Sequence, residues 1–366
     1  MESGHPVVRN LKRRISEGGP IGIATFMEIA LGDPEGGYYT TRDPFGTDGD
    51  FTTAPEISQM YGELLGLWSI DTWQALGSPD RFALVELGPG RGTLMSDAVR
   101  AMALVPECRA AAQIHLVETS PVLRQAQAQA LPDQGVIWHE SLPTLDGEPM
   151  ICLANEFLDA LPIRQFVMTP EGWRERRVDH DAGSGTFRFV ANGPEKPQGD
   201  LSAHWIDGAE TGDIVEQSPA VEAVVTEISR YVQLHGGAGL FVDYGHSRHG
   251  LGETLQAVRQ HQPIDPLTAP GESDLTAHVD FLTVANTARA ASAQVHGPVD
   301  QGNFLQRLGI RERADALLKS ADAAQSRGIE TGLTRLIAPA EMGTLFKVIA
   351  ISDHRLARLA GFEPTA

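Results

Sequence analysis

A glycine-rich turn between a strand and a helix is the feature that most constrains this fold. The run Phe82–Leu87 has the uniform apolarity of a buried strand, and residues 93–104 have apolar positions at helical spacing. Between them, Gly88, Gly90 and Gly92 alternate with other residues, and the absence of Cβ atoms lets a ligand approach the backbone. The pattern predicts an α/β fold with a ligand site at this turn.

Further strands and helices alternate along the chain. Apolar runs predict strands at 113–118, 136–138, 150–154, 239–243 and 344–351, and apolar periodicity predicts helices at 121–130, 220–234, 280–291 and 303–326. Strands separated by helices need crossover connections, so we predict a parallel sheet with helices on both faces. Ligands then bind beyond the carboxyl ends of its strands.

Two segments depart from this rhythm. Residues 1–80 precede the glycine turn and include a helix near 57–76, which predicts an N-terminal helical cap. Residues 163–235 form an insertion, because 163–168, 173–178 and 186–190 alternate like antiparallel strands and a helix follows. The core is then 81–162 plus 236–366, with a long ordered active-site loop near 246–275.

The charge balance excludes several classes of function. There are 48 acidic and 29 basic side chains, a formal charge of −19, and we find no basic patch that could hold a nucleic acid. No apolar run approaches the roughly 18 residues of a membrane span, so no membrane insertion is expected. Cys108 and Cys152 have neither metal-ligand nor disulfide spacing and are predicted to be buried free thiols. We expect a cytoplasmic protein, with the mitochondrial matrix as the alternative.

The spacing of the turn discriminates between cofactors. A dinucleotide turn carries Gly or Ala three residues after its second glycine, but Thr93 stands there, and no phosphate-binding G-x-x-x-x-G-K-[ST] occurs. The E-x-G-x-G-x-G pattern that begins at Glu86 resembles the first motif of class I S-adenosylmethionine-dependent methyltransferases. The alternative is a glycine turn that only permits close packing of strand and helix.

An acid follows the second strand of the predicted sheet. The carboxylate of Glu118 can accept both hydrogen bonds from vicinal ribose hydroxyls, as the corresponding acid does in dinucleotide folds. Its alternative is a solvated cap. Glu140 and Ser141, just beyond the third strand, are placed near an adenine by the same reasoning.

Acids also follow the fourth strand. Glu156 and Asp159 can fix a guanidinium and localise its charge, which suits a cationic acceptor held for methyl transfer. The alternative makes Glu156 a helix cap and Asp159 a surface residue. Asp243 and His246, at the end of a later strand, are further candidates for acceptor binding.

No metal site is predicted. Asp274, His278 and Asp280 have the residue types of metal ligands, but their spacing does not match a helix-face motif such as H-E-x-x-H.

Six motifs in order identify a family. They are Asp50-Phe-Thr-Thr-Ala-Pro-Glu-Ile-Ser58 with Gly62-Glu63, Glu86-Leu-Gly-Pro-Gly-Arg-Gly-Thr-Leu94, Val117-Glu-Thr-Ser-Pro121, Asn155-Glu-Phe-Leu-Asp-Ala-Leu-Pro162, Asp243-Tyr-Gly-His246, and Gly271-Glu-Ser-Asp-Leu-Thr-Ala-His-Val-Asp-Phe281. This set resembles the MidA family of class I methyltransferases, whose mitochondrial members assist complex I assembly by symmetric dimethylation of an arginine in a quinone-side subunit.

The resemblance implies a Rossmann-like class I methyltransferase sheet with an N-terminal helical region and inserted antiparallel strands. It implies cofactor contacts at Gly88, Gly90, Gly92 and Glu118, an acceptor facing Glu156 and Asp159, and a lid formed by residues 50–56. The expected function is S-adenosylmethionine-dependent methylation of a protein arginine, with a respiratory complex I subunit as candidate client. The alternative is a noncatalytic assembly chaperone that keeps the fold. An NAD-dependent dehydrogenase is the third and least favoured hypothesis.

Overall fold

A computed structural model describes residues 4–41, 52–193 and 208–363. The chain divides into two compact units. Unit 1 comprises Met1–Phe51, Asp159–Ala223 and Arg248–His278, and unit 2 comprises Thr52–Leu158, Val224–Ser247 and Val279–Ala366. This division differs from the predicted boundaries, because the segment 1–80 contributes to both units and Arg248–His278 joins the insertion rather than the core.

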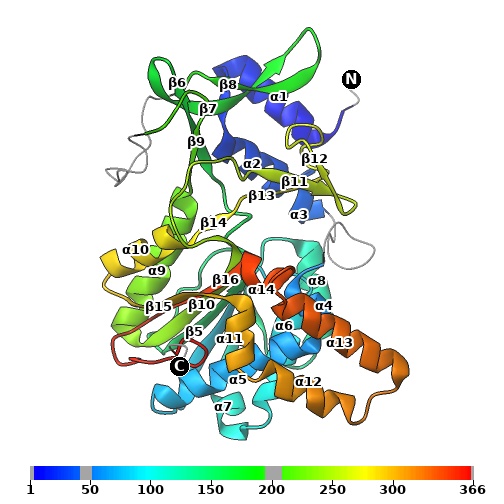
Figure 1. Cartoon of the computed structure of the whole chain (residues 1–366), viewed down its shortest axis with the longest axis vertical. Coiled ribbons are helices and arrows are strands. Elements are labelled where there is room, and N and C mark those ends of the chain that lie inside the picture. The colour runs from blue at the N-terminus through cyan, green and yellow to red at the C-terminus, as the bar shows by residue number, and fades with distance from the viewer. Residues whose placement is uncertain (1–3, 42–51, 194–207, 364–366) are drawn as a thin grey trace. The chain divides into compact units, whose positions relative to one another are not determined.

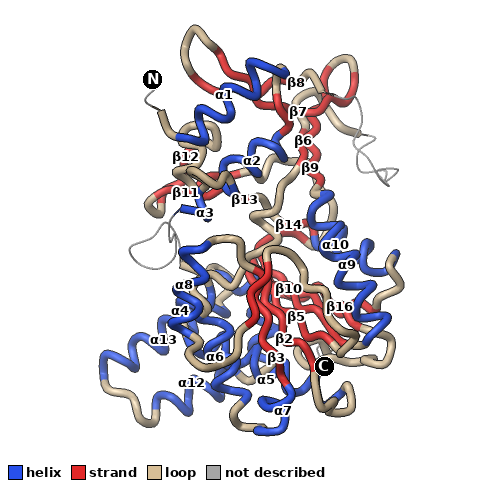
Figure 2. The backbone as a smooth tube through the Cα atoms, turned by 180° about the vertical axis from the view of Figure 1, so that it is seen from behind, coloured by secondary structure: helices blue, strands red, loops and turns tan. Residues whose placement is uncertain are grey.

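Unit 2 is built on a sheet of mostly parallel strands (Figures 1 and 2). The strand order is β15-β16-β10-β5-β2-β3-β4, and a short strand, β14, pairs with β10. Strand β16 runs antiparallel to both of its neighbours. The strands are β2 (Phe82–Leu87), β3 (Ala112–Val117), β4 (Ile137–His139), β5 (Met150–Asn155), β10 (Gly237–His246), β14 (Val279–Asp280), β15 (Gln294–Asp300) and β16 (Phe346–Ser352). The predicted parallel α/β sheet is confirmed.

Helices cover both faces of this sheet (Figure 1). They are α4 (Ala54–Ile57), α5 (Gln59–Ala75), α6 (Thr93–Met102), α7 (Pro106–Ala111), α8 (Pro121–Ala130), most of α9 (Pro219–His235), α10 (Phe281–Ala290), α11 (Gln301–Arg307), α12 (Ile310–Leu318), α13 (Ala323–Ile337) and α14 (Met342–Leu345). The prediction of a single helix over 303–326 is wrong. Gly309 has a φ of +89°, which ends one helix before the next begins, and Asp322 forms a capping box that starts α13.

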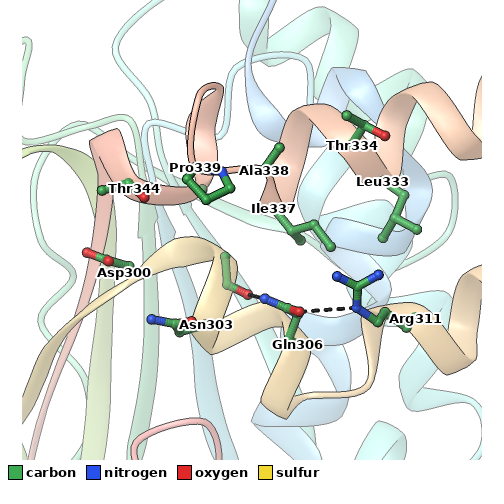
Figure 3. A pocket seen from close by; sticks show the side chains of 12 residues that line it. Asp300, Asn303, Gln306, Arg311, Leu333, Thr334, Ile337, Ala338, Pro339 and Thr344 are labelled. Carbon is green, nitrogen blue, oxygen red and sulfur yellow. Dashed lines mark hydrogen bonds between the residues drawn. The ribbon is translucent and has the colours of Figure 1, made fainter.

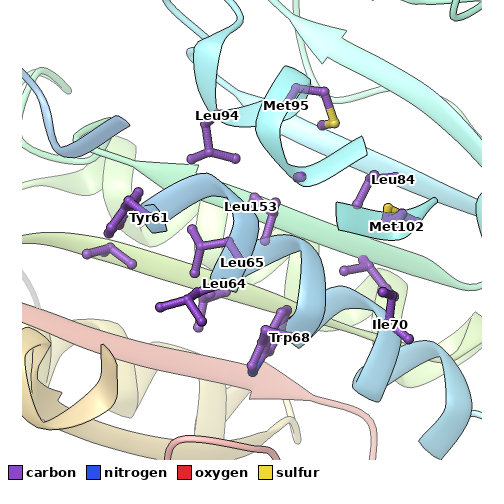
Figure 4. Close-up of a cluster of buried hydrophobic side chains, with 14 of the residues drawn as sticks. Tyr61, Leu64, Leu65, Trp68, Ile70, Leu84, Leu94, Met95, Met102 and Leu153 are labelled. Carbon is purple, nitrogen blue, oxygen red and sulfur yellow. The ribbon is translucent and has the colours of Figure 1, made fainter. Parts of the chain in front are cut away.

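A large hydrophobic cluster includes the contact between helix α5 and the sheet (Figure 4). Helix α5 is apolar on nearly all sides, so it is buried rather than amphipathic. Its side chains Leu64, Leu65 and Trp68 pack with Leu84 of β2 and Leu153 of β5. The segment predicted to be a peripheral cap therefore supplies a central helix of the core.

Unit 1 consists of two antiparallel sheets with helices. One has the order β1-β7-β6-β9 with β8 beside β7, and the other has the order β12-β11-β13. Its elements are α1 (Pro6–Gly18), β1 (Ile21–Gly22), α2 (Ile23–Gly32), α3 (Tyr38–Thr41), β6 (Arg164–Thr169), β7 (Gly172–Asp181), β8 (Thr186–Ala191), β9 (Ile214–Gln217), β11 (Gln256–Arg259), β12 (Gln262–Ile264) and β13 (Asp274–Thr276).

The inserted antiparallel strands are confirmed, and two features of unit 1 are additional. Strand β1 pairs with β7, so the N-terminal segment takes part in the inserted sheet. The segment 246–275, predicted to be a long ordered loop, contains β11, β12 and the start of β13. Its strands were missed because they are only three or four residues long.

Two glycines in helices offer a test of packing in unit 2. A Cβ on Gly66 of α5 would lie 2.6 Å from the carbonyl oxygen and 2.7 Å from the Cα atom of Ala98 in α6. Because backbone atoms cannot move aside cheaply, Gly66→Ala should lower the free energy of unfolding by about 1–3 kcal/mol. A Cβ on the exposed Gly328 of α13 would meet no atom within 4 Å, so Gly328→Ala should raise it by up to about 1 kcal/mol. Urea unfolding of both variants tests this, and equal effects would contradict the packing argument.

Candidate functional site

The glycine turn follows strand β2 and has a left-handed backbone. Its φ angles are +60° at Gly88, +52° at Gly90 and +83° at Gly92, a region that side chains with a Cβ adopt only with strain. A Cβ on Gly88 would lie 3.0 Å from the ring of Phe157, and one on Gly92 would lie 3.3 Å from Cα of Gln127. The turn therefore needs its glycines for conformation and for close packing, whatever binds to it.

Gln127 of helix α8 connects the turn to the acid that follows β3. It is fully buried, and its Nε2 donates to the carbonyl oxygen of Gly90 at 2.8 Å and to Oε2 of Glu118 at 3.2 Å. Its Oε1 accepts from the indole N–H of Trp138 at 2.8 Å. Because an indole N–H can only donate, Trp138 forces the amide oxygen toward β4 and the NH₂ group toward the other two partners.

Two buried carboxylates lie at the ends of neighbouring strands. Glu118 is 7% exposed, and its Oε1 accepts from the backbone N–H of Ser120 at 2.7 Å. Burial raises its pKa, while the bonds from Ser120 and Gln127 oppose that shift. A carboxylate held this way at the carboxyl edge of a parallel sheet can accept bonds from a bound ligand's hydroxyls.

Glu86 is the more perturbed of the two acids. It is 3% exposed, and its Oε2 is a buried atom without a hydrogen-bond partner among the described residues. Burial, and secondarily the negative charge of Glu118, raise its pKa to about 8. An unsatisfied buried carboxylate oxygen beside a glycine turn indicates a site suited to a positively charged or hydrogen-bond-donating ligand.

Glu156 follows strand β5 and holds the first residue of helix α4. Its backbone has a φ of +49°, rare for a residue with a Cβ. Its Oε1 accepts from the backbone N–H of Ala54 at 3.0 Å and from the side-chain amide of Asn155 at 3.1 Å. The hydroxyl of Tyr61 donates in turn to Asn155. A polar network thus ties α5, the end of β5 and α4 together.

Helix α4 is also tied to the glycine turn. Glu56 of α4 accepts a hydrogen bond from the hydroxyl of Thr93, the first residue of α6. Residues 52–56 of the predicted lid are therefore anchored at both Glu156 and Thr93. Asp50 and Phe51, the first two residues of that predicted lid, lie outside the described residues.

Asp243 lies on β10, the strand next to β5. It is 1% exposed, with Oδ2 accepting from the backbone N–H of Leu158 at 3.0 Å and Oδ1 accepting from that of Tyr244 at 2.9 Å. These bonds hold the backbone after β5. His246, at the end of β10, has its Nδ1 3.9 Å from Oδ1 of Asp280, which caps helix α10.

Asp159 belongs to unit 1, although it is only three residues from Glu156 in the chain. Its carbonyl oxygen accepts from the backbone N–H of Ala277 at 3.0 Å. In the same unit, the hydroxyl of Tyr39 donates to Asp274 at 2.7 Å. Burial, and then the charges of Asp274 and Asp159, raise the pKa of Tyr39, so this phenol stays protonated.

The remaining candidates have simple environments. Glu140 and Ser141 are exposed just after β4. Cys108 and Cys152 are buried free thiols, as predicted, and burial raises the pKa of each. Within 4–41, 52–193 and 208–363, no cluster of three His, Cys, Asp or Glu side chains could hold a metal ion. None of the described helices is long and apolar enough to cross a bilayer.

Sequence reasoning missed three residues of this site. Gln127 lies on an unremarkable helix, and only its contacts reveal a role. Tyr61 is one of many apolar residues of α5. Glu86 belongs to the turn pattern, but its unsatisfied oxygen is visible only when its burial is known.

Comparisons with known proteins give one consistent answer. A family model of S-adenosyl-L-methionine-dependent methyltransferases matches residues 64–299. A Drosophila melanogaster protein named protein arginine methyltransferase NDUFAF7 homolog, mitochondrial, is 38% identical over 97% of this chain and 87% of its own. The human protein arginine methyltransferase NDUFAF7, mitochondrial, is 37% identical over 97% of this chain and 85% of its own.

A solved structure also matches across nearly the whole chain. It is described as a likely methyl transferase from Burkholderia thailandensis bound to S-adenosyl-homocysteine, and it is 28% identical with a TM-score of 0.83. The match covers 97% of this chain and 95% of that one.

The raised pKa of Glu86 predicts a specific pH dependence. The carboxyl group ionises near 4.5 when unfolded and near 8 when folded, so the folded state binds more protons between these values. The stability that this group contributes is present below about pH 4.5 and is lost as pH rises toward 8, by up to about 1.4 kcal/mol per pH unit. Glu86→Gln removes this loss.

Urea unfolding of the wild type and Glu86→Gln at pH 5.5, 6.5 and 7.5 measures the effect. We expect the variant to gain stability relative to the wild type as pH rises. Parallel stability curves would show that Glu86 ionises normally in the folded protein.

Proposed function

Because this chain belongs to the MidA family of class I S-adenosylmethionine-dependent methyltransferases, we propose that it methylates an arginine side chain of a protein. The observation that carries the proposal is the similarity, over nearly the whole chain, to relatives that are named protein arginine methyltransferases. Within this proposal the candidate client is a subunit of respiratory complex I, as the family resemblance of the motifs implies.

The chain's residues fit the cofactor. S-adenosylmethionine carries a sulfonium and an ammonium group, and the site provides buried acids, with the unpartnered Oε2 of Glu86 beside the glycine turn. We propose that Gly88, Gly90 and Gly92 line the cofactor and that Glu118 accepts bonds from its ribose. When bound, the cofactor supplies an electrophilic methyl carbon.

We propose that Glu156 and Asp159 contact the acceptor. A guanidinium donates in parallel to a carboxylate, which fixes its orientation and draws its charge away from the attacking nitrogen. Oε1 of Glu156 accepts from Ala54 and Asn155, which places this carboxylate at the end of β5 and ties it to α4.

The compartment of the reaction stays a prediction. The sequence predicts the cytoplasm and offers the mitochondrial matrix as the alternative. The curated relatives are named mitochondrial, which favours that alternative.

The direct test is the identity of the methylated residue. The purified protein and tritiated S-adenosylmethionine are incubated with extract from source cells that lack this protein and with the complex I fraction of those cells. The labelled proteins are then hydrolysed, and their amino acids are separated by chromatography. We expect label in methylarginine. Label in another amino acid would overturn the arginine proposal. The absence of any label, with a protein that still binds S-adenosyl-homocysteine, would also overturn it. Restoration of complex I assembly without any product would support the noncatalytic chaperone.

Cofactor binding should depend on Gln127. Gln127→Met removes the donors to Gly90 and Glu118, and hydrogen bonds to a charged group contribute about 1.5–3 kcal/mol, so S-adenosyl-homocysteine should bind at least about tenfold more weakly. Gln129→Met on the exposed side of the same helix is the matched control. Calorimetric titration of both variants, with thermal unfolding to verify their folding, makes the comparison. Equal affinities would remove Gln127 from the cofactor site.

Turnover should depend on the charges of Glu156 and Asp159. Glu156→Gln keeps an oxygen that can accept from Ala54, so it preserves the anchor of α4 while it removes the charge. We expect Glu156→Gln and Asp159→Asn, each alone, to lower methyl transfer by at least about 100-fold while affinity for S-adenosyl-homocysteine stays within about twofold. Normal turnover in either variant would refute the acceptor role of that residue.

A further inference from the structure

A cavity with a volume of about 460 Å³ lies in unit 2, and no residue of the glycine turn lines it (Figure 3). It lies among helices α11, α12, α13 and the segment before β16. Its lining includes Asp300, Gln306, Arg311, Leu333, Ile337 and Thr344. None of them belongs to the site described above.

The cavity lies at the ligand-binding edge of the sheet. Asp300 is the last residue of β15, and Thr344 lies just before β16 begins. Because β16 runs antiparallel to β10, its start lies beside the carboxyl end of β10, where Phe346 is paired with Tyr244. The glycine turn follows β2 at this same edge, with β5 and β10 in between. A ligand that extends along the edge from β5 toward β15 would reach the cavity.

The cavity is shaped by two glycines beneath the end of helix α13. A Cβ on Gly302 would lie 2.5 Å from the carbonyl oxygen of Ile337, and one on Gly343 would lie 2.2 Å from the same atom. Neither glycine has the positive φ that would by itself explain its presence. Close approach of three backbone segments is therefore what requires glycine at both positions and shapes this wall of the cavity.

The charge available in the cavity is that of Arg311. Its Nε donates to Oε1 of Gln306 at 3.1 Å, and Nε2 of Gln306 donates to the carbonyl oxygen of Gly302 at 2.8 Å, which fixes the amide orientation (Figure 3). Asp300 is the acid among the lining residues, and it is paired with Lys347 at 2.7 Å. In the described parts of the chain, Arg311 has no carboxylate within ion-pair distance.

A guanidinium without a carboxylate partner prefers an anionic ligand. Its terminal nitrogens can donate two parallel hydrogen bonds to a carboxylate. Leu333, Ile337 and Pro339 are apolar residues of the lining, and they lie on or just after helix α13 (Figure 3). The volume falls in the range of sites for small ligands, so it can take a side chain and its neighbour but not a folded domain.

We propose that this cavity binds an acidic side chain of the protein acceptor, together with an adjacent apolar residue, at a distance from the methylated position. Arg311 pairs with the Asp or Glu carboxylate, and the apolar neighbour lies on Leu333 and Ile337. This inference rests on the proposed function, since it assumes a polypeptide acceptor. The cavity would then contribute to substrate specificity. An acceptor segment that carries the Asp or Glu residue is held at the edge of the sheet while the arginine of the same segment reaches the cofactor.

Binding is tested directly with a defined probe. N-acetyl-Ala-Glu-Leu-amide is titrated into isotope-labelled protein, and backbone amide shifts are followed by NMR. We expect shifts at residues 302–306 and 333–338 with the Glu peptide, no shifts with its Gln counterpart, and loss of the shifts in Arg311→Glu. A third arm uses 4-methylpentanoate, which separates a free small acid from a peptide. Tighter binding of the free acid than of the peptide, or no binding of either, would overturn the proposal.

Turnover supplies a second, independent measurement. In the extract assay, Arg311→Glu should raise the extract concentration needed for half-maximal methylation by about tenfold, with the maximal rate and S-adenosyl-homocysteine affinity unchanged. Arg327→Glu on the exposed part of α13 makes the same charge change outside the cavity and is the control. Equal behaviour of the two variants would overturn the role of the cavity in acceptor binding.

The two proposals can fail separately. Methylarginine formation with no peptide shifts and no difference between Arg311→Glu and Arg327→Glu refutes the cavity alone. Peptide shifts at the cavity without any methylarginine refute the arginine acceptor and leave the binding site for acidic peptides standing.

Discussion

Buried carboxylates at one edge of a parallel sheet are the constraint on which this structure depends. Glu86 and Asp243 lie near the ends of β2 and β10, Glu118 follows β3, and the half-buried Glu156 follows β5. Charges held away from water cost free energy unless they are neutralised or hydrogen-bonded. The chain meets that cost with backbone N–H groups of Ser120, Ala54, Leu158 and Tyr244. These hydrogen bonds fix the position of the turns and helix ends that supply the donors. Glu86 differs, because its Oε2 has no hydrogen-bond partner among the described residues and its pKa is raised.

This arrangement supports the proposal that a positively charged methyl donor binds at this edge. A ligand with ammonium and sulfonium groups compensates acids that the protein itself satisfies only in part. The glycine turn provides room beside them, and Gln127 couples its backbone to Glu118. Toward β15 the same edge changes character. Within the described residues, Arg311 has no carboxylate partner, and the acid of that cavity, Asp300, is bound to Lys347. The edge thus carries two chemically distinct regions, an acidic one near the glycine turn and one that contains Arg311 near β15.

Local sequence signals were reliable wherever an element is determined by its own residues. Helix α8 has the predicted bounds, because Pro121 starts it and Ser120 caps it. Strands β2 and β5 are continuous apolar runs that only a buried strand accommodates in so short a length. The prediction of one helix over 303–326 failed because apolar periodicity continues through Gly309, whose left-handed φ breaks the helix without interrupting the pattern. Strand β1 was missed because two residues carry no periodicity, and only its pairing with β7 defines it.

The sequence by itself determined the fold class, the cofactor class and the position of the glycine turn, because these follow from short motifs whose residues are neighbours in the chain. Only the tertiary structure decided which side chains complete the site. Gln127 contacts Gly90 across 37 residues, and Glu156 contacts Ala54 across 102. It also placed Asp159 in a different unit from Glu156, despite their proximity in sequence. Hydrogen bonds depend on separations in space that side-chain packing sets, and no local pattern of residue types records them.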